Sequence, residues 1–253
     1  MKKGVFVIAI VICAIVFGVS AYNLISYYSD NRAAEKGFAE LLPEEIAGAD
    51  VVVEGDEKSE YDYMLPHYQS LREDNSDMVG WLRIPGTRIS YPVMQTKDSP
   101  EFYLRRDFNK EFSMNGCLFV DSKGDVDLPT DVVLVYGHRM RSNAMFGTLG
   151  DFLDPEFLDQ TYTIIFDTFT ERNVYYIYCL FSLDVSVAGS FDYYNYTQFH
   201  DRGVYDDFMN GVNAHKEIEK PENTPEYGDK ILLLSTCEYT HADGRLIIVA
   251  VKQ

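Results

Sequence analysis

The first feature of the chain is an uninterrupted apolar run near its N-terminus. Residues 5–21 carry no charge, two lysines precede them, and residues 22–25 extend the run with apolar and aromatic side chains. This pattern predicts a membrane-spanning helix, with the lysines favouring a cytoplasmic N-terminus and an exported remainder. The alternative is a cleaved signal peptide, because Val19-Ser20-Ala21 resembles a small-residue cleavage site. Both interpretations carry the rest of the chain across the membrane.

The segment that follows, residues 26–60, is polar and acidic. Pro43, Gly48 and Gly55 interrupt any long helical period, which predicts a helical stalk that passes into a flexible linker. Within residues 61–75, apolar and aromatic side chains recur at spacings of three and four, as expected for a helix packed against the domain that follows. We therefore expect an anchor over residues 1–25, a stalk and linker over 26–60 and one folded domain over 61–253.

Short β-rich runs separated by turn residues fill the rest of the chain. We expect eight strands, at residues 81–84, 89–94, 117–120, 132–136, 162–166, 174–183, 231–236 and 246–251. Between the sixth and seventh of them, Val204, Phe208 and Val212 recur every four residues and predict an amphipathic helix that covers one flank. The whole pattern predicts a mainly β fold with peripheral helices, in the form of a closed antiparallel β-barrel.

Composition and charge narrow the classes of partner. The 253 residues include 40 acidic and 22 basic side chains, for a formal net charge of -18, which opposes binding to nucleic acid. The four cysteines, at positions 13, 117, 179 and 237, form no close-spaced pair, so neither a disulfide scaffold nor a zinc site is expected. The sequence also contains no Gly-rich phosphate loop, and we expect no metal and no cofactor.

Cys237 stands where a buried strand reaches its end. Residues 231–234 are apolar at every position, as in a strand buried on both faces, and the chain then turns polar. Arg245 begins the next apolar run, and the intervening Asp243-Gly244 is a strong turn signal. Such a hairpin brings the thiol and the guanidinium to the same end of adjacent antiparallel strands, within about 5 Å plus the reach of an arginine.

His138 has a comparable place, because it follows the predicted strand 132–136 by two residues. A cysteine nucleophile needs a base to favour its thiolate, a histidine can later protonate a leaving amine, and an arginine can donate hydrogen bonds to an oxyanion. Each residue alone is more often structural, the cysteine as a small buried hydrophobe and the others as solvated or paired groups. Their shared placement at strand ends favours a Cys/His/Arg site, without separating hydrolysis from transpeptidation.

Three ordered motifs resemble those of class B sortases. Leu234-Ser235-Thr236-Cys237 followed by Gly244-Arg245 resembles the sortase signature, with Leu233 in place of its first threonine. Tyr136-Gly137-His138-Arg139-Met140 followed by Met145-Phe146-Gly147 is similar to the segment around the histidine of that class. Residues 80–87 with Tyr91-Pro92-Val93 resemble its opening strands. The resemblance covers roughly residues 61–253.

This resemblance implies a sortase-like eight-stranded β-barrel with an N-terminal helix and a long helix between the sixth and seventh strands. It implies a single-pass membrane protein whose catalytic domain, residues 61–253, lies on the extracellular face. Cys237 would cleave a Thr-Gly-type bond in the C-terminal sorting signal of an exported protein and pass the acyl group to a peptidoglycan amine. His138 and Arg245 would assist catalysis, while Ser235 and the backbone amide of Glu238 would contact the substrate.

Other interpretations stay open at this stage. A sortase that joins pilin subunits, a thiol peptidase that only hydrolyses and a noncatalytic cell-surface binding module are the alternatives. His241, in the turn before Arg245, is the rival to His138 as the base. Cys117 and Cys179 fall within predicted strands and are expected to be buried and unreactive. Three tyrosines are clustered in the sequence, and they either border the substrate groove or pack against the core: Tyr193, Tyr194 and Tyr196.

Overall fold

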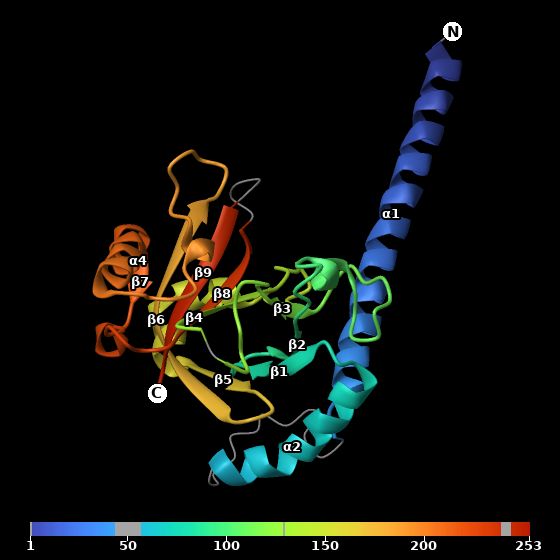
Figure 1. The fold of residues 1–253 in the computed structure, drawn as a ribbon. Helices are drawn as coiled ribbons and strands as arrows, with labels where there is room; N and C mark the ends of the chain where they lie inside the picture. The colour runs from blue at the N-terminus through green and yellow to red at the C-terminus, as the bar shows by residue number, and fades with distance from the viewer. Residues whose placement is uncertain (1, 44–56, 129, 239–243) are drawn as a thin grey trace.

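The structure of the chain is a computed structural model. It describes residues 2–43, 57–128, 130–238 and 244–253, and for residues 2, 3, 5, 57–59, 237 and 238 it describes the backbone alone. A long N-terminal helix, α1 (Lys2–Glu40), stands beside a β-barrel, and a second helix, α2 (Glu57–Asp74), lies at the base of the barrel (Figure 1). α2 confirms the helix expected over residues 61–75. The expected linker falls largely on residues 44–56, which lie outside the described residues.

Among the described residues, eight strands close into the barrel. They are β1 (Met78–Arg83), β2 (Ser90–Met94), β3 (Leu118–Val120), β4 (Val132–Tyr136), β5 (Thr163–Asp167), β6 (Arg172–Asp184), β8 (Ile231–Glu238) and β9 (Gly244–Lys252). Their order around the ring is β5-β1-β2-β3-β4-β8-β9-β6, and the pairing of β5 with β6 closes it. All eight expected strands are confirmed, and with them the mainly β fold class.

Strand direction is the point on which the expectation of an antiparallel barrel was wrong. β2 and β3 are parallel, and so are β4 and β8, in which Tyr136 lies opposite Ser235. The other barrel pairings in the described part of the chain are antiparallel. Parallel neighbours need a long crossover connection, and here the chain builds β5, β6 and α4 between β4 and β8. Hydrophobic periodicity reports which face of a strand is buried, but not the direction in which it runs.

The helix expected after the sixth strand is confirmed as α4 (Arg202–His215). Asp201 caps it, because its carboxylate accepts a hydrogen bond from Val204 N at 3.0 Å. The short β7 (Ile218–Glu219) then pairs with β6 outside the ring. The buried residues of α4 are Tyr205, Phe208, Met209 and Val212. The other helical segments of the described chain are α3 (Pro155–Gln160), η1 (Phe102–Arg105), η2 (Leu149–Leu153), η3 (Tyr193–Asn195) and η4 (Pro221–Asn223).

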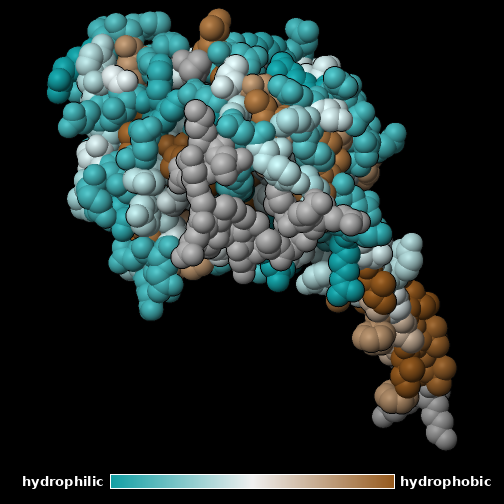
Figure 2. Space-filling model, turned by 90° about the horizontal axis from the view of Figure 1, so that it is seen from below, coloured by the Kyte–Doolittle hydropathy of each residue, from teal (hydrophilic) through white to brown (hydrophobic). Residues whose placement is uncertain are grey.

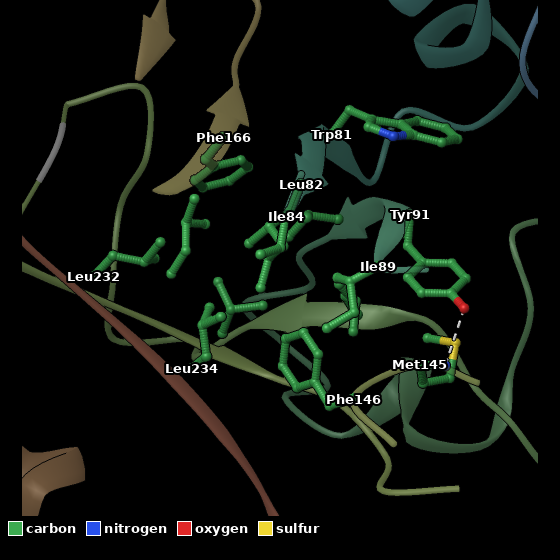
Figure 3. Close-up of a cluster of buried hydrophobic side chains, with 14 of the residues drawn as sticks. Trp81, Leu82, Ile84, Ile89, Tyr91, Met145, Phe146, Phe166, Leu232 and Leu234 are labelled. Carbon is green, nitrogen blue, oxygen red and sulfur yellow. Dashed lines mark hydrogen bonds between the residues drawn. The ribbon is translucent and has the colours of Figure 1, made fainter. Parts of the chain in front are cut away.

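β8 is buried on both of its faces, as its apolar run predicts. Leu232 and Leu234 belong to the main cluster of buried side chains, together with Phe146 (Figure 3). Ile231 and Leu233 belong to the second cluster, which includes the buried face of α4. All four side chains of the run are at most 1% exposed, and each contributes about 1.5–3 kcal/mol by its burial. β8 is therefore a well-packed support for the residues at its end.

α1 has two parts with different surroundings. From residue 6 to residue 25 its apolar side chains are mostly exposed, and Figure 2 shows them along the part that projects from a largely hydrophilic face. By length and composition, α1 is the one helix in the described part of the chain that qualifies to cross a membrane. The C-terminal part packs on the barrel, where Phe38 is 4% exposed and meets Tyr91 edge to face at 5.3 Å between ring centroids. The sequence pattern did not predict this contact.

Candidate active site

Three neighbouring strands bring the predicted catalytic residues to one end of the barrel. Because β4 and β8 are parallel, their C-terminal ends lie together, with Tyr136 opposite Ser235. His138 follows Tyr136 by two residues, as Cys237 follows Ser235. In the antiparallel pair of β8 and β9, Cys237 lies directly opposite Arg245. Since neighbouring strands are about 4.8 Å apart, the backbone of Cys237 lies beside that of Arg245, and His138 follows the end of the strand on the other side of β8.

His138 is held by the backbone of η1. Its Nε2 lies 2.7 Å from the carbonyl oxygen of Leu104. Because a carbonyl only accepts hydrogen bonds, Nε2 carries the proton, and Nδ1 is the atom of the neutral ring that takes up a proton. Burial lowers the pKa of His138 below its ordinary value of 6.5; the hydrogen bond to Leu104 opposes this shift, and the charge of Arg105 adds to it. The imidazole is therefore uncharged at neutral pH, the state that a general base requires.

A pocket of about 550 Å³ opens at this end of the barrel. His138 and Arg245 lie in its wall, and Arg245 is half-buried with its guanidinium donating to the carbonyl oxygen of Gly244 at 3.0 Å. The rest of the wall mixes apolar, aromatic and charged side chains, among them Glu101, Leu104, Phe119, Asp121 and Val185. Such a mixed, concave surface is typical of a binding site for a small molecule or a short peptide.

The two predicted substrate contacts lie on β8. Ser235 lines the pocket, but it is 0% exposed and its hydroxyl is hydrogen-bonded to that of Tyr193 at 2.8 Å. Thr236 beside it is also buried, and its hydroxyl has no hydrogen-bond partner within the described residues. Glu238 lies opposite Gly244, and its side chain is outside the described atoms. The hydroxyl of Ser235 is therefore already engaged within the wall.

Two contributors to this site were not predicted from the sequence. The hydroxyl of Tyr136, in the pocket wall, donates to the carboxylate of Asp121 at 3.3 Å. Burial raises the pKa of Tyr136 above its ordinary value, so the phenol stays protonated. Its place next to Gly137 and His138 was the available signal. Leu104 offered no signal, because it contributes a backbone carbonyl that any residue carries.

The clustered tyrosines divide between the pocket and the core. Tyr193 and Tyr194 line the pocket, whereas the ring of Tyr196 packs edge to face on a buried aromatic side chain of α4. Cys117 and Cys179 are 1% and 0% exposed, which confirms their expected burial. Burial raises the pKa of both thiols, and a protonated thiol is a poor nucleophile.

Two of the remaining histidines bond backbone carbonyls, His200 is exposed, and the last lies outside the described residues. His67 and His215 each bond a backbone carbonyl, that of Leu41 and that of Gly211. His241, the rival base, falls outside the described residues. Over the ranges that the structure describes, no three His, Cys, Asp or Glu side chains gather as metal ligands would.

Known proteins match the chain across the barrel. A family model described as the sortase domain matches residues 82–253, more than half of the chain. Sortase B of Staphylococcus aureus is 31% identical over 191 residues, which cover 75% of this chain and 75% of that protein.

Solved sortase B structures share the fold as well. A mutant form of Clostridium perfringens sortase B superposes with a TM-score of 0.72 at 24% identity, covering 87% of this chain and 96% of that one. The Staphylococcus aureus sortase B–substrate complex gives a TM-score of 0.68 at 26% identity, covering 78% of this chain and 92% of that one. The family model, the related sequence and the fold agree, and the chain therefore belongs to the sortase family as a class B member.

Proposed function

We propose that this class B sortase is a cysteine transpeptidase that uses Cys237 to join the C-terminal sorting signal of an exported protein to a cell-wall amine. The observation that carries the proposal is the backbone register at one end of the barrel. Cys237 lies opposite Arg245, and His138 follows the parallel strand β4 on the other side. Membership of a family of cysteine transpeptidases supports the same reaction.

The reaction begins when the thiol of Cys237 gives its proton to Nδ1 of His138. The thiolate attacks the carbonyl carbon of the Thr-Gly-type bond, and the resulting oxyanion accepts hydrogen bonds from the guanidinium of Arg245. When the tetrahedral intermediate collapses, the carbon–nitrogen bond breaks, His138 protonates the leaving amine, and the acyl group stays on Cys237 as a thioester. An incoming amine then attacks the thioester, gives its proton to His138 and releases Cys237.

The pocket supplies the substrate contacts in this proposal. Its volume of about 550 Å³ suits a few residues of an extended peptide. The backbone amide of Glu238, next to the nucleophile, would be a second oxyanion donor. Ser235 would act through the wall that it forms with Tyr193, because its hydroxyl is bonded there. The shared fold with Staphylococcus aureus sortase B, which has been solved as a substrate complex, supports a peptide in this position.

α1 is the membrane anchor in this proposal. Residues 1–25 span the bilayer with the N-terminus in the cytoplasm, and residues 61–253 form the catalytic domain on the extracellular face. The apolar side chains exposed between residues 6 and 25, and the two lysines before them, support this orientation. Residues 26–60 connect the two, with their first part held against the barrel by Phe38.

A joining assay tests the proposal. The purified chain is incubated with a sorting-signal peptide, with and without an added amine, and the products are identified by mass spectrometry. We expect an amide-linked product that needs the amine and is absent with Cys237→Ala. Cleavage products that are the same with and without the amine would indicate a thiol peptidase. Iodoacetamide labelling that is no faster at Cys237 than at Cys117 would indicate a noncatalytic binding module.

A further inference from the structure

The loop that carries His138 is held from outside the barrel. We call residues 138–147 the His138 loop. Within it, Phe146 N donates to the carbonyl oxygen of His138 at 3.0 Å. Met145, just before Phe146, has a φ of 52°, a left-handed backbone that residues other than glycine rarely adopt. The position of His138 therefore depends on the contacts that keep Met145 in this conformation.

Two hydrogen-bonded connections run from the His138 loop to α1. The hydroxyl of Tyr91 accepts a hydrogen bond from Met145 N at 3.1 Å (Figure 3) and donates to the carboxylate of Glu35, 3.0 Å from each oxygen. Farther along the loop, the hydroxyl of Ser142 donates to Oδ1 of Asn31 at 3.1 Å. Both connections end on the part of α1 that follows the apolar run.

The polar character of these contacts is unusual for a helix that only has to adhere to the barrel. Asn31 is 2% exposed and Glu35 is half-buried, and burying such groups is unfavourable unless they are hydrogen-bonded. Phe38 lies three residues after Glu35 on the same face of α1 and contacts the barrel through an apolar side chain. An apolar residue at the position of Asn31 or Glu35 could hold the helix against the barrel in the same way. Nδ2 of Asn31 donates to the carbonyl oxygen of Tyr27 at 2.7 Å, which orients Oδ1 towards the loop. Asn31 and Glu35 therefore connect α1 to the His138 loop through specific hydrogen bonds.

We propose that Asn31 and Glu35 are positioning residues of the catalytic site, which keep the His138 loop in the conformation in which His138 acts. The inference rests on the proposed function of His138. Neither side chain touches the pocket, so their loss slows turnover without weakening substrate binding. The anchor helix is then part of the apparatus that supports catalysis, and a chain from which α1 is detached turns over more slowly.

The test uses the full-length chain in detergent micelles, with kcat and KM measured for the joining of a sorting-signal peptide to an amine. Asn31→Ala and Glu35→Ala should lower kcat roughly 10-fold to 100-fold with little change in KM, as a small displacement of a catalytic group does. Glu35→Gln keeps an acceptor for the hydroxyl of Tyr91 and should restore most of the rate. Lys36→Ala, one residue along α1 and with a side chain 77% exposed, is the matched control and should behave as the wild type.

Melting temperatures show that each variant is folded at the assay temperature. If Glu35→Ala does not fold, Tyr91→Phe removes the same connection at its middle and should lower kcat alone. If it folds, the double variant Glu35→Ala/Tyr91→Phe should lose no more than either single variant, because both break one connection. Rates equal to that of Lys36→Ala overturn the proposal. A wild type that forms no joined product refutes the proposed function instead.

Discussion

A single methyl group at Gly116 tests how η1 supports His138. Gly116 has a φ of 60°, and a Cβ at this position would lie 2.5 Å from the carbonyl oxygen of Tyr103 and 2.6 Å from that of Leu104. Backbone oxygens cannot come so close to a Cβ, so the backbone at Gly116 and the peptide units of η1 must move apart in Gly116→Ala. The oxygen of Leu104 is the acceptor for Nε2 of His138 at 2.7 Å, and its movement breaks or lengthens that hydrogen bond.

The expected magnitude has two parts. The left-handed backbone costs alanine about 1–2 kcal/mol, and the overpacking adds about 1–3 kcal/mol, for a total of about 2–5 kcal/mol in the free energy of unfolding. A misplaced His138 lowers kcat roughly 100-fold. The hydrogen bond to Leu104 now raises the pKa of His138, so its loss lowers that pKa and moves the acid limb of kcat/KM to lower pH.

The assay combines urea unfolding, followed by the fluorescence of the single tryptophan, with steady-state kinetics. That tryptophan, Trp81, is 1% exposed and reports on the core. Gly228→Ala is the matched control, because Gly228 also has a positive φ, 109°, but no heavy atom lies within 4 Å of its added Cβ. It precedes β8, at the end of that strand away from Cys237. If Gly116→Ala loses no more stability or rate than Gly228→Ala, the support of His138 by η1 is refuted.

Three further predictions concern the site and its supports. Arg245→Lys keeps the charge but loses the planar fork of donors, so kcat should fall roughly 100-fold to 1,000-fold in the joining assay; an effect on KM alone would contradict a role at the oxyanion. Because the folded-state pKa of His138 lies below 6.5, the unfolded chain binds more protons in acid, and the free energy of unfolding should fall as the pH drops through 6.5 towards the folded-state value. Urea unfolding at several pH values measures this loss, and the same slope in His138→Gln would count against it. Leu233→Ala, at a side chain 0% exposed in the cluster beneath α4, should cost about 2–5 kcal/mol in urea unfolding, and a cost below about 1 kcal/mol would mean that this face is loosely packed.

Local sequence patterns were sufficient to predict the strands, the covering helix and part of the site. The apolar run 231–234 predicted a strand buried on both faces, and β8 is one. The spacing of Phe208 and Val212 predicted the buried face of α4. The hairpin that places Cys237 opposite Arg245 followed from two adjacent apolar runs and a turn signal. The buried strand, the buried helix face and the hairpin can each be predicted from a short stretch of sequence. The pattern of buried side chains repeats with a period set by the local backbone, and the turn signal lies between adjacent strands.

Only the tertiary structure decided how distant segments meet. Strand periodicity does not encode direction, so the parallel pairing of β4 and β8, which brings the strand end before His138 next to the strand end at Cys237, was not visible in the chain. The acceptor for His138 is a backbone carbonyl 34 residues earlier, at Leu104. The sequence by itself determined the strands, the covering helix and the place of Cys237 at the end of its strand. The surroundings of His138 and the contacts of α1 through Asn31 and Glu35 were decided by the tertiary structure. A backbone carbonyl is present in every residue, so no residue type in the sequence marks the acceptor for His138. A polar side chain that hydrogen-bonds to a distant segment cannot be told from a solvated one in the sequence.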